Sequence, residues 1–210
     1  MPVVFLLSPA SCNGRRAEIL MSERATFELA QRLRAPAGAP IGDVFTFLSG
    51  LYFRGKLAYA RAFTAPDRAG ASAANRVFVI TPSTGLQPPE ALVDLAALRR
   101  FAGVEIAADN PAYRGPLERS AKALASSLGP EHPVVLLGSV ASPKYVDVLA
   151  PIFGDRLLFP QEFVGRGDMS RGGLMLRCAA AGQSLSYVPV AGAIRRGVRP
   201  PKLDPATRAR

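Results

Sequence analysis

Apolar residues are arranged along this chain in two ways, as short continuous runs and as longer stretches with helical spacing. The continuous runs lie within residues 3–7, 76–81, 133–138 and 156–159, where Arg76 and Arg156 stand just before the apolar residues of the second and fourth runs. Runs of this length that are apolar throughout are typical of strands buried on both faces. Helices are predicted for residues 16–33, 51–63, 89–101, 117–128, 144–153 and 174–181. Strands that alternate with helices predict an α/β protein, a three-layer α/β/α fold with a mainly parallel central sheet.

Several shorter segments complete the expected order. Residues 44–48 fit either a strand or the start of the next turn, and residues 104–115 read as irregular. Small residues at 65–74 predict a linker, and residues 184–190 are a candidate last strand. The length of 210 residues suits one domain over residues 1–190. Residues 191–210 then form a basic, proline-rich tail, expected to be extended and to order only against the body or a polyanion.

Composition and the length of the apolar runs bear on the compartment of the protein and on the partners, metals and cofactors it is expected to lack. No apolar run reaches the roughly 18 residues needed to span a bilayer, and no secretory signal pattern is present, so we expect no membrane partner and a cytoplasmic protein. The two cysteines provide no disulfide framework, and with a single histidine a zinc site is not expected. No motif indicates a cofactor. His132 precedes an apolar strand, away from the carboxyl ends where sites form, so we interpret it as structural. The oligomeric state stays open.

The charge points to an anionic partner. The formal net charge is +10 and the isoelectric point is near 10.4, which favours nucleic acid or nucleotide phosphate. The alternative is a set of solvated surface arginines reflecting a GC-rich genome.

The loop after the first strand, SPASCNGRR, is the first candidate site. It joins a buried strand to a helix, where free backbone N–H groups face a ligand in α/β proteins. The loop offers hydrogen-bonding groups, a glycine for close backbone approach and two phosphate-binding cations: Ser8, Ser11, Asn13, Gly14, Arg15 and Arg16. It matches neither the Walker loop nor the dinucleotide fingerprint, and a plain turn with a serine cap is the alternative. Cys12 is a weaker candidate, a thiol acidified by the helix N-terminus but without a visible base.

The second candidate site is the sequence GRGDMSRGG at residues 165–173. Backbone amides in such loops form concavities that bind anions. Arg166, Ser170 and Arg171 would bind substrate, and Asp168 would orient a water or a sugar hydroxyl. A flexible surface loop is the alternative. Because both loops follow predicted parallel strands and precede helices, we expect them to face one pocket, with four arginines converging on it. Arg54, Ser139 and Lys144 are further candidate binding residues, and Lys56, on the same predicted helix as Arg54, is a second cation that could reach a phosphate.

Four segments together resemble a prokaryotic domain family of unassigned function. They read LLSPASCNGRRA, SGLYFRGKLAYA, FVITPSTGLQPPE and VVLLGSVASPKY, and the similarity spans most of residues 1–175. The order is also similar to the uracil-DNA-glycosylase-like α/β/α fold, to which the middle domain of archaeosine synthase looks related. The resemblance implies a base-binding pocket at the carboxyl edge of the sheet, flanked by serine and arginine loops that hold phosphate. It implies a water-positioning residue in the first loop, where Asn13 is the nearest equivalent. The family's histidine-containing loop corresponds here to GRGDMSRGG, which has no histidine.

These observations predict a glycosylase-like enzyme that acts on an N-glycosidic bond or modified base in nucleic acid or a nucleotide. Asn13 and Asp168 would be catalytic, stabilising or hydrating an oxocarbenium ion. Two alternatives remain: a non-catalytic nucleic-acid-binding protein, and an enzyme on a small phosphorylated metabolite.

Overall fold

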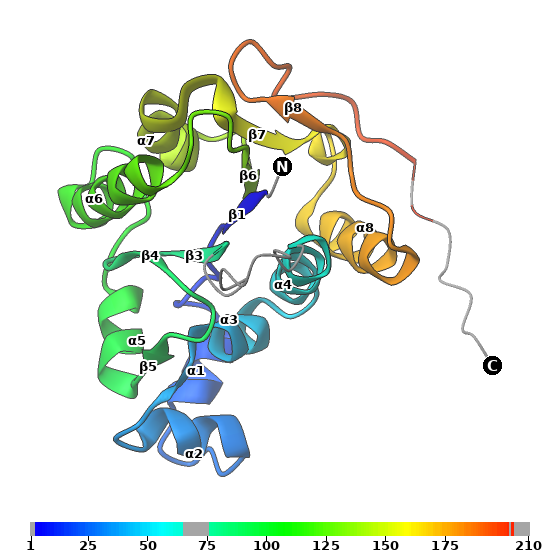
Figure 1. Cartoon of the computed structure of the whole chain (residues 1–210). Coiled ribbons are helices and arrows are strands. Elements are labelled where there is room, and N and C mark those ends of the chain that lie inside the picture. Colours follow the sequence, from blue (N-terminus) through cyan, green and yellow to red (C-terminus); the bar gives the residue numbers. More distant parts are fainter. Residues whose placement is uncertain (1–2, 65–75, 202, 204–210) are drawn as a thin grey trace, which may run out of the picture.

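A six-stranded sheet lies at the centre of the molecule (Figure 1). The computed structural model describes residues 3–64, 76–201 and 203, so the predicted linker at 65–74 and most of the tail beyond residue 201 lie outside the described part. The strands follow the order β4-β3-β1-β6-β7-β8. Their bounds are β1 Val4–Leu7, β3 Val77–Thr81, β4 Gly85–Gln87, β6 Val134–Leu137, β7 Leu157–Pro160 and β8 Tyr187–Pro189. A separate pair joins β2 (Ala39–Pro40) to β5 (Leu92–Val93).

The four predicted strands are adjacent and parallel, which confirms the predicted α/β/α class. β1 pairs with β3 on one side and β6 on the other, and β6 pairs with β7, in each case in parallel. β4 and β8 are short antiparallel strands at the two edges. The predicted last strand is therefore β8, running against its neighbour.

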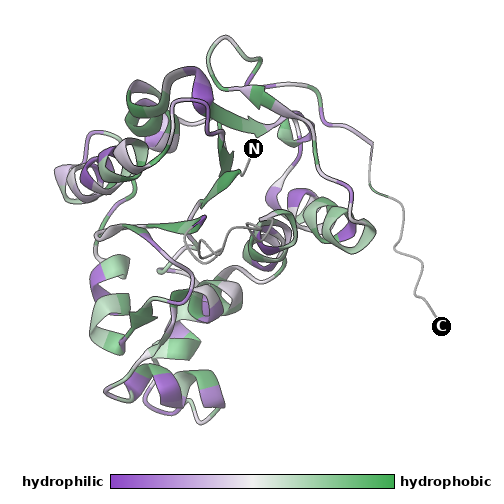
Figure 2. Cartoon of the chain, viewed as in Figure 1, coloured by the Kyte–Doolittle hydropathy of each residue, from purple (hydrophilic) through white to green (hydrophobic). Residues whose placement is uncertain are grey.

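Helices cover both faces of the sheet, and the alternation of side chains along β1 shows why. Phe5 and Leu7 pack into one apolar core, and Val4 and Leu6 pack into the other. The first core lies under α1 (Arg15–Met21), α2 (Glu28–Arg34), α3 (Ile41–Ser49), α4 (Leu51–Phe63), α5 (Leu95–Ala102) and α8 (Asp168–Ala181). The second lies under α6 (Pro111–Ser127) and α7 (Pro143–Phe153). Figure 2 shows the hydrophobic strands between these two layers.

Several predicted boundaries are wrong, and local hydrogen bonds explain most of them. The helix predicted for residues 16–33 is two helices, because the Ser22 hydroxyl accepts a bond from the Arg24 N–H and Arg34 donates to the Ser22 carbonyl across the turn between them. Residues 44–48 belong to α3. α6 begins at Pro111 within the segment predicted irregular, where the Asn110 side chain caps it. Short 3₁₀ turns, η2 (Gly154–Arg156) and η3 (Gln161–Phe163), flank β7.

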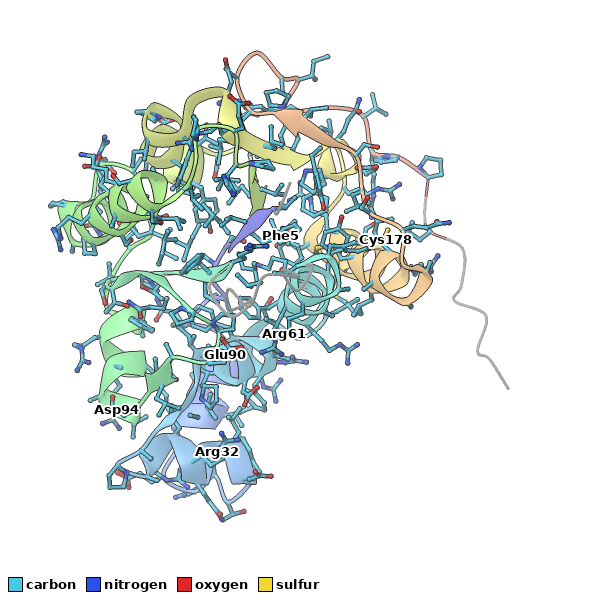
Figure 3. The ribbon with its side chains drawn as sticks, in the orientation of Figure 1. Phe5, Arg32, Arg61, Glu90, Asp94 and Cys178 are labelled. Atoms are coloured by element: carbon cyan, nitrogen blue, oxygen red, sulfur yellow. The ribbon has the colours of Figure 1, made fainter. Side chains whose placement is uncertain are left out.

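The helix predicted from residue 89 begins later, at Leu95. The Asp94 carboxylate caps α5 by accepting the N–H of Ala97 at 2.6 Å (Figure 3). Before it, Arg61 and Glu90 form an ion pair at 2.8 Å that connects α4 with the segment leading into β5. The carboxylate gives a partner to an N–H that would otherwise be unsatisfied at the helix start, and so fixes the start of α5 directly after Asp94. The residues before Asp94 therefore lie outside the helix, and Leu92–Val93 form β5.

Helices α4 and α8 lie side by side in Figure 1 and approach very closely. A Cβ on Gly55 would lie 2.6 Å from the Gly172 carbonyl oxygen, and one on Gly172 would lie 2.7 Å from the Leu51 carbonyl oxygen. Only residues without a side chain fit at this distance. Gly172 was predicted to belong to an anion-binding loop, but α8 already begins at Asp168 and Gly172 is a helix-packing residue. This contact fixes α8 over α4 beside the end of β1.

Candidate functional site

A cavity of about 480 Å³ opens at the carboxyl edge of the parallel strands. Loops that follow β1, β3 and β6 line it, and so do parts of α3, α4, α5 and α7 and the first residue of α8. The lining residues are Ser8, Pro9, Ala10, Ser11, Cys12, Asn13, Leu48, Ser49, Tyr52, Pro82, Phe101, Val104, Glu105, Ile106, Ser139, Lys144, Tyr145 and Asp168. This is the edge at which open α/β sheets bind ligands, and the volume suits a nucleoside-sized molecule.

The cavity combines an apolar wall with polar groups. The wall comes from α3, α5 and the segment after α5, and its larger side chains are Leu48, Phe101, Val104 and Ile106. The polar groups include the hydroxyls of Ser8, Tyr52 and Tyr145 and the charged side chains of Glu105, Lys144 and Asp168. Polar side chains that converge beside an apolar wall are typical of sites that bind and orient a small molecule.

Lys56 lies behind the cavity and is completely buried. Its Nζ donates to the Ser8 carbonyl oxygen and lies 2.8 Å from Ser8 Oγ. The ammonium also sits over two aromatic rings of its own helix, 4.3 Å from the Tyr52 centroid and 5.0 Å from that of Phe53. Lys56 does not line the cavity itself, but it contacts Ser8, which does.

Burial lowers the pKa of Lys56 to about 7. Removal from water disfavours the ammonium form, the negative charge of Asp168 opposes that effect, and the positive charges of Arg171 and Lys144 add to it. A lysine with this pKa holds a free electron pair in a large fraction of molecules near neutral pH, unlike an exposed lysine.

The Tyr52 hydroxyl is buried against the cavity and has no hydrogen-bond partner among the described residues. Burial raises the pKa of Tyr52 to about 12; the positive charge of Arg171 and weak hydrogen bonding from Arg171 and Ser8 to the phenol oppose that effect, and the negative charge of Asp168 adds to it. Neither Arg171 nor Ser8 has the distance and alignment of a full hydrogen bond to the hydroxyl. The phenol therefore keeps its proton and is a donor at neutral pH. An unpaired buried donor is costly to a protein, so this hydroxyl is placed as a bound ligand would require.

Asp168 and Arg171 on the first turn of α8 differ sharply in exposure. The Arg171 side chain is 10% exposed, and its Nε and Nη2 donate to the Phe163 carbonyl at 3.2 and 2.9 Å. Its Nη1 lies 3.6 Å from Asp168 Oδ1. The Asp168 side chain is 66% exposed and lines the cavity. Arg171 thus positions α8 and Asp168 and does not itself reach the cavity.

The structure brings six of the predicted site residues to one cavity, although up to about 160 residues separate them in sequence. They are Ser8, Ser11, Asn13, Ser139, Lys144 and Asp168. The remaining candidates, which include every predicted arginine, lie outside the cavity lining: Gly14, Arg15, Arg16, Arg54, Arg166, Ser170 and Arg171.

The predicted convergence of four arginines is therefore not observed, because most of these side chains bond to the protein or face solvent. Arg16 donates to the Phe47 carbonyl at 3.0 Å. Arg166 donates to Ser170 Oγ and to the carbonyl of Pro201, which holds the middle of the tail beside α8. Arg15 and Arg54 are exposed. Asp168 is consequently not the counter-charge of an arginine cluster within the cavity.

Cys12 also departs from expectation. Burial raises the pKa of its thiol to about 12, although acidification by the helix N-terminus was expected. Its Sγ donates to the Ala10 carbonyl. Loss of hydration outweighs the short helix α1, so Cys12 is a protonated, unreactive thiol at neutral pH.

Tyr52 and Tyr145 were not selected from the sequence, and Lys56 was considered only as a cation for a phosphate, whereas the structure buries it behind the cavity. One signal was present in the sequence. Lys56 lies four residues after Tyr52 and three before Tyr59, so helical periodicity places it on the apolar side of residues 51–63. A lysine in that position is unusual unless it is paired or functional.

Within the described residues, no group of three or more histidine, cysteine, aspartate or glutamate side chains is arranged to hold a metal ion. None of the described helices has the length and apolar character needed to cross a membrane. Comparisons with protein-family models, with curated proteins and with solved structures find no match to this chain.

Proposed function

We propose that this protein is an enzyme that binds a nucleobase-bearing ligand in the cavity and cleaves its N-glycosidic bond. The observation that carries the proposal is the meeting of Asn13 and Asp168 in one cavity, from the loop after β1 and the start of α8. An amide and an ionised carboxylate are the pair expected for holding a base and stabilising positive charge on a sugar. The resemblance to the uracil-DNA-glycosylase-like fold supports the same reaction.

The reaction follows from the character of the two parts of the cavity. A flat base packs against Phe101 and Ile106, and Asn13 hydrogen-bonds its edge. The bond from sugar to base breaks with its electron pair moving to the base nitrogen, and the Asp168 carboxylate stabilises the resulting oxocarbenium ion. A water adds to the sugar carbon, and its proton leaves for the departing base or solvent. Lys144, in the first turn of α7, supplies a cation for a phosphate of the ligand.

A second candidate is an enzyme on a small phosphorylated metabolite. The distribution of cations favours it over simple binding of nucleic acid. Lys144 is the one lysine or arginine that lines the cavity within the described residues, whereas a nucleic-acid groove carries several. A free nucleotide satisfies both this observation and the first proposal.

The test is release of free base, measured by chromatography, from nucleosides, nucleoside monophosphates and oligonucleotides that carry deaminated or alkylated bases. Asp168→Asn should lower the rate by about 100-fold or more while leaving ligand affinity within a few-fold. Asp147→Asn, at an exposed position on α7 outside the cavity, is the matched control and should be unchanged. Binding of nucleotides without any base release would favour the second candidate, and absence of both would refute the proposal.

Salt dependence distinguishes the partner. Affinity for a polymer should fall steeply between 50 and 200 mM salt if several phosphates are contacted, and hardly at all for a mononucleotide held by Lys144. A steep slope without base release would support the nucleic-acid-binding alternative.

A further inference from the structure

Ser8, Lys56 and Tyr52 form a second chemical group at the cavity that N-glycosidic cleavage does not use. Ser8 lines the cavity, Lys56 Nζ lies 2.8 Å from its hydroxyl oxygen, and the Tyr52 hydroxyl has no partner. Tyr52 and Lys56 are one turn apart on α4, so both face Ser8, the first residue after β1. A serine next to a buried amine meets the geometric requirement for an activated nucleophile.

We propose that Ser8 is a nucleophile toward acyl carbons, with Lys56 as its general base and the Tyr52 hydroxyl as hydrogen-bond donor to the oxyanion. The substrate class is an ester or amide with an acyl group small enough for the cavity. This activity stands apart from the N-glycosidic reaction and does not depend on it, because it needs neither Asn13 nor a nucleobase.

Acyl transfer to Ser8 needs only these three residues and the substrate. The Ser8 Oγ–H proton moves to the free electron pair of Lys56 Nζ while Oγ bonds to the carbonyl carbon. The carbonyl π electrons move to its oxygen, which Tyr52 holds by donation. The tetrahedral intermediate collapses, the C–O or C–N bond to the leaving group breaks, and the leaving group takes the proton from Lys56. Water then repeats the sequence on the acyl-serine, which releases a carboxylic acid and restores Ser8.

The surroundings of Lys56 argue against a purely structural role. No carboxylate lies within salt-bridge distance of its Nζ among the described residues, and its nearby charges are Asp168, Arg171 and Lys144. Burying an amine without a counter-ion is unfavourable, and an apolar side chain of similar size would fill the same space at lower cost. Since the net effect of those charges and of burial is a pKa of about 7, the amine is able to accept a proton at neutral pH.

Two measurements on the full chain test this proposal. The first is covalent labelling by a fluorophosphonate probe, with the modified residue located by peptide mass spectrometry, and the second is hydrolysis of p-nitrophenyl acetate and butyrate. Labelling should occur at Ser8 and disappear in Ser8→Ala. Lys56→Met should slow labelling by about 100-fold or more. Ser126→Ala and Lys122→Met, exposed positions on α6 away from the cavity, should label at the rate of the unmodified protein.

A pH profile of the unmodified protein keeps the test valid if Lys56→Met does not fold. The labelling rate should rise with pH and level off above an inflection near pH 7. Tyr52→Phe should slow ester hydrolysis by about 10-fold or more and leave the inflection in place. A rate that rises only above pH 9, labelling that persists in Ser8→Ala, or no labelling of the folded protein would overturn the proposal. Absence of base release in the glycosidic assay would leave all of these outcomes unchanged.

Discussion

Two tyrosines on the same face of α4 differ in whether their hydroxyl groups have hydrogen-bond partners. Tyr59, completely buried, bonds the Tyr187 hydroxyl and accepts the N–H of Leu185 at 2.8 Å. Tyr52, two turns earlier, is almost as buried, but its hydroxyl has no partner. The end of α4 that holds β8 in place is thus fully paired, and the end that borders the cavity is not. Buried polar groups that serve the fold are paired within the fold, so the unpaired hydroxyl identifies where a ligand belongs.

The largest effect should come from Lys56, the charged group at the unpaired end. Because its folded-state pKa lies below its unfolded value of 10.5, the unfolded state binds more protons between about pH 7 and pH 10.5, so the free energy of unfolding rises with pH in that window. The rise from pH 7 to pH 9 should be about 2–2.5 kcal/mol and be absent in Lys56→Met. Urea unfolding at pH 7, 8 and 9 measures it. Equal slopes in the two proteins would show that Lys56 is not a buried amine.

Stability should be nearly as sensitive to substitutions at the close contact between α4 and α8. Gly172→Ala places a methyl group 2.7 Å from the Leu51 carbonyl oxygen, which should lower the free energy of unfolding by about 1–3 kcal/mol. The matched control is Gly173→Ala, where the nearest atom outside the helix is 3.7 Å away. It should be neutral or stabilising by up to about 1 kcal/mol, because alanine favours a helix. Similar losses in both variants would mean that the helices are not in tight contact.

The tyrosine pair provides the direct comparison. Tyr59→Phe removes the partner of the Leu185 N–H and of Tyr187, so it should cost about 1–3 kcal/mol in chemical denaturation. Tyr52→Phe removes a hydroxyl that has no partner and should change stability by less than about 0.5 kcal/mol or increase it. A larger loss in Tyr52→Phe than in Tyr59→Phe would contradict the assignment of the two ends.

The smallest expected effect concerns Arg16, a paired polar group on the surface. Arg16→Ala removes the bond to the Phe47 carbonyl and should lower stability by about 0.5–1 kcal/mol, whereas Arg15→Ala should leave it unchanged within about 0.5 kcal/mol. Neither should alter affinity for a mononucleotide, because neither residue lines the cavity. Loss of nucleotide binding in Arg15→Ala would restore the phosphate-binding role first expected for this loop.

Periodicity in the sequence was enough to predict the parallel strands and the layers, because a strand buried on both faces leaves an unbroken apolar run. It failed at segments such as residues 16–33, where a serine hydroxyl and a long-range arginine bond divide one apolar stripe into two helices. At the candidate site, the expectation that Asn13 and Asp168 share one cavity is met because loops at strand ends meet at one edge of the sheet. The arginines were misplaced because sequence does not show which carbonyls a guanidinium will bind. The role of Lys56 was not recognised because its contacts with the Ser8 carbonyl and hydroxyl join residues that lie 48 positions apart in the sequence.

The central place of β1 has a consequence for synthesis on the ribosome. Both neighbours of β1 come much later in the chain: Phe5 pairs with Val77 in β3, and Val4 pairs with Val134 in β6. At translation rates of about 5–20 residues per second, the strand VFLL waits on the order of ten seconds for its second partner. During that time four apolar residues are exposed, with unpaired backbone groups that other chains can join. We expect nascent chains shorter than about 130 residues to bind chaperones and to aggregate when chaperones are limiting.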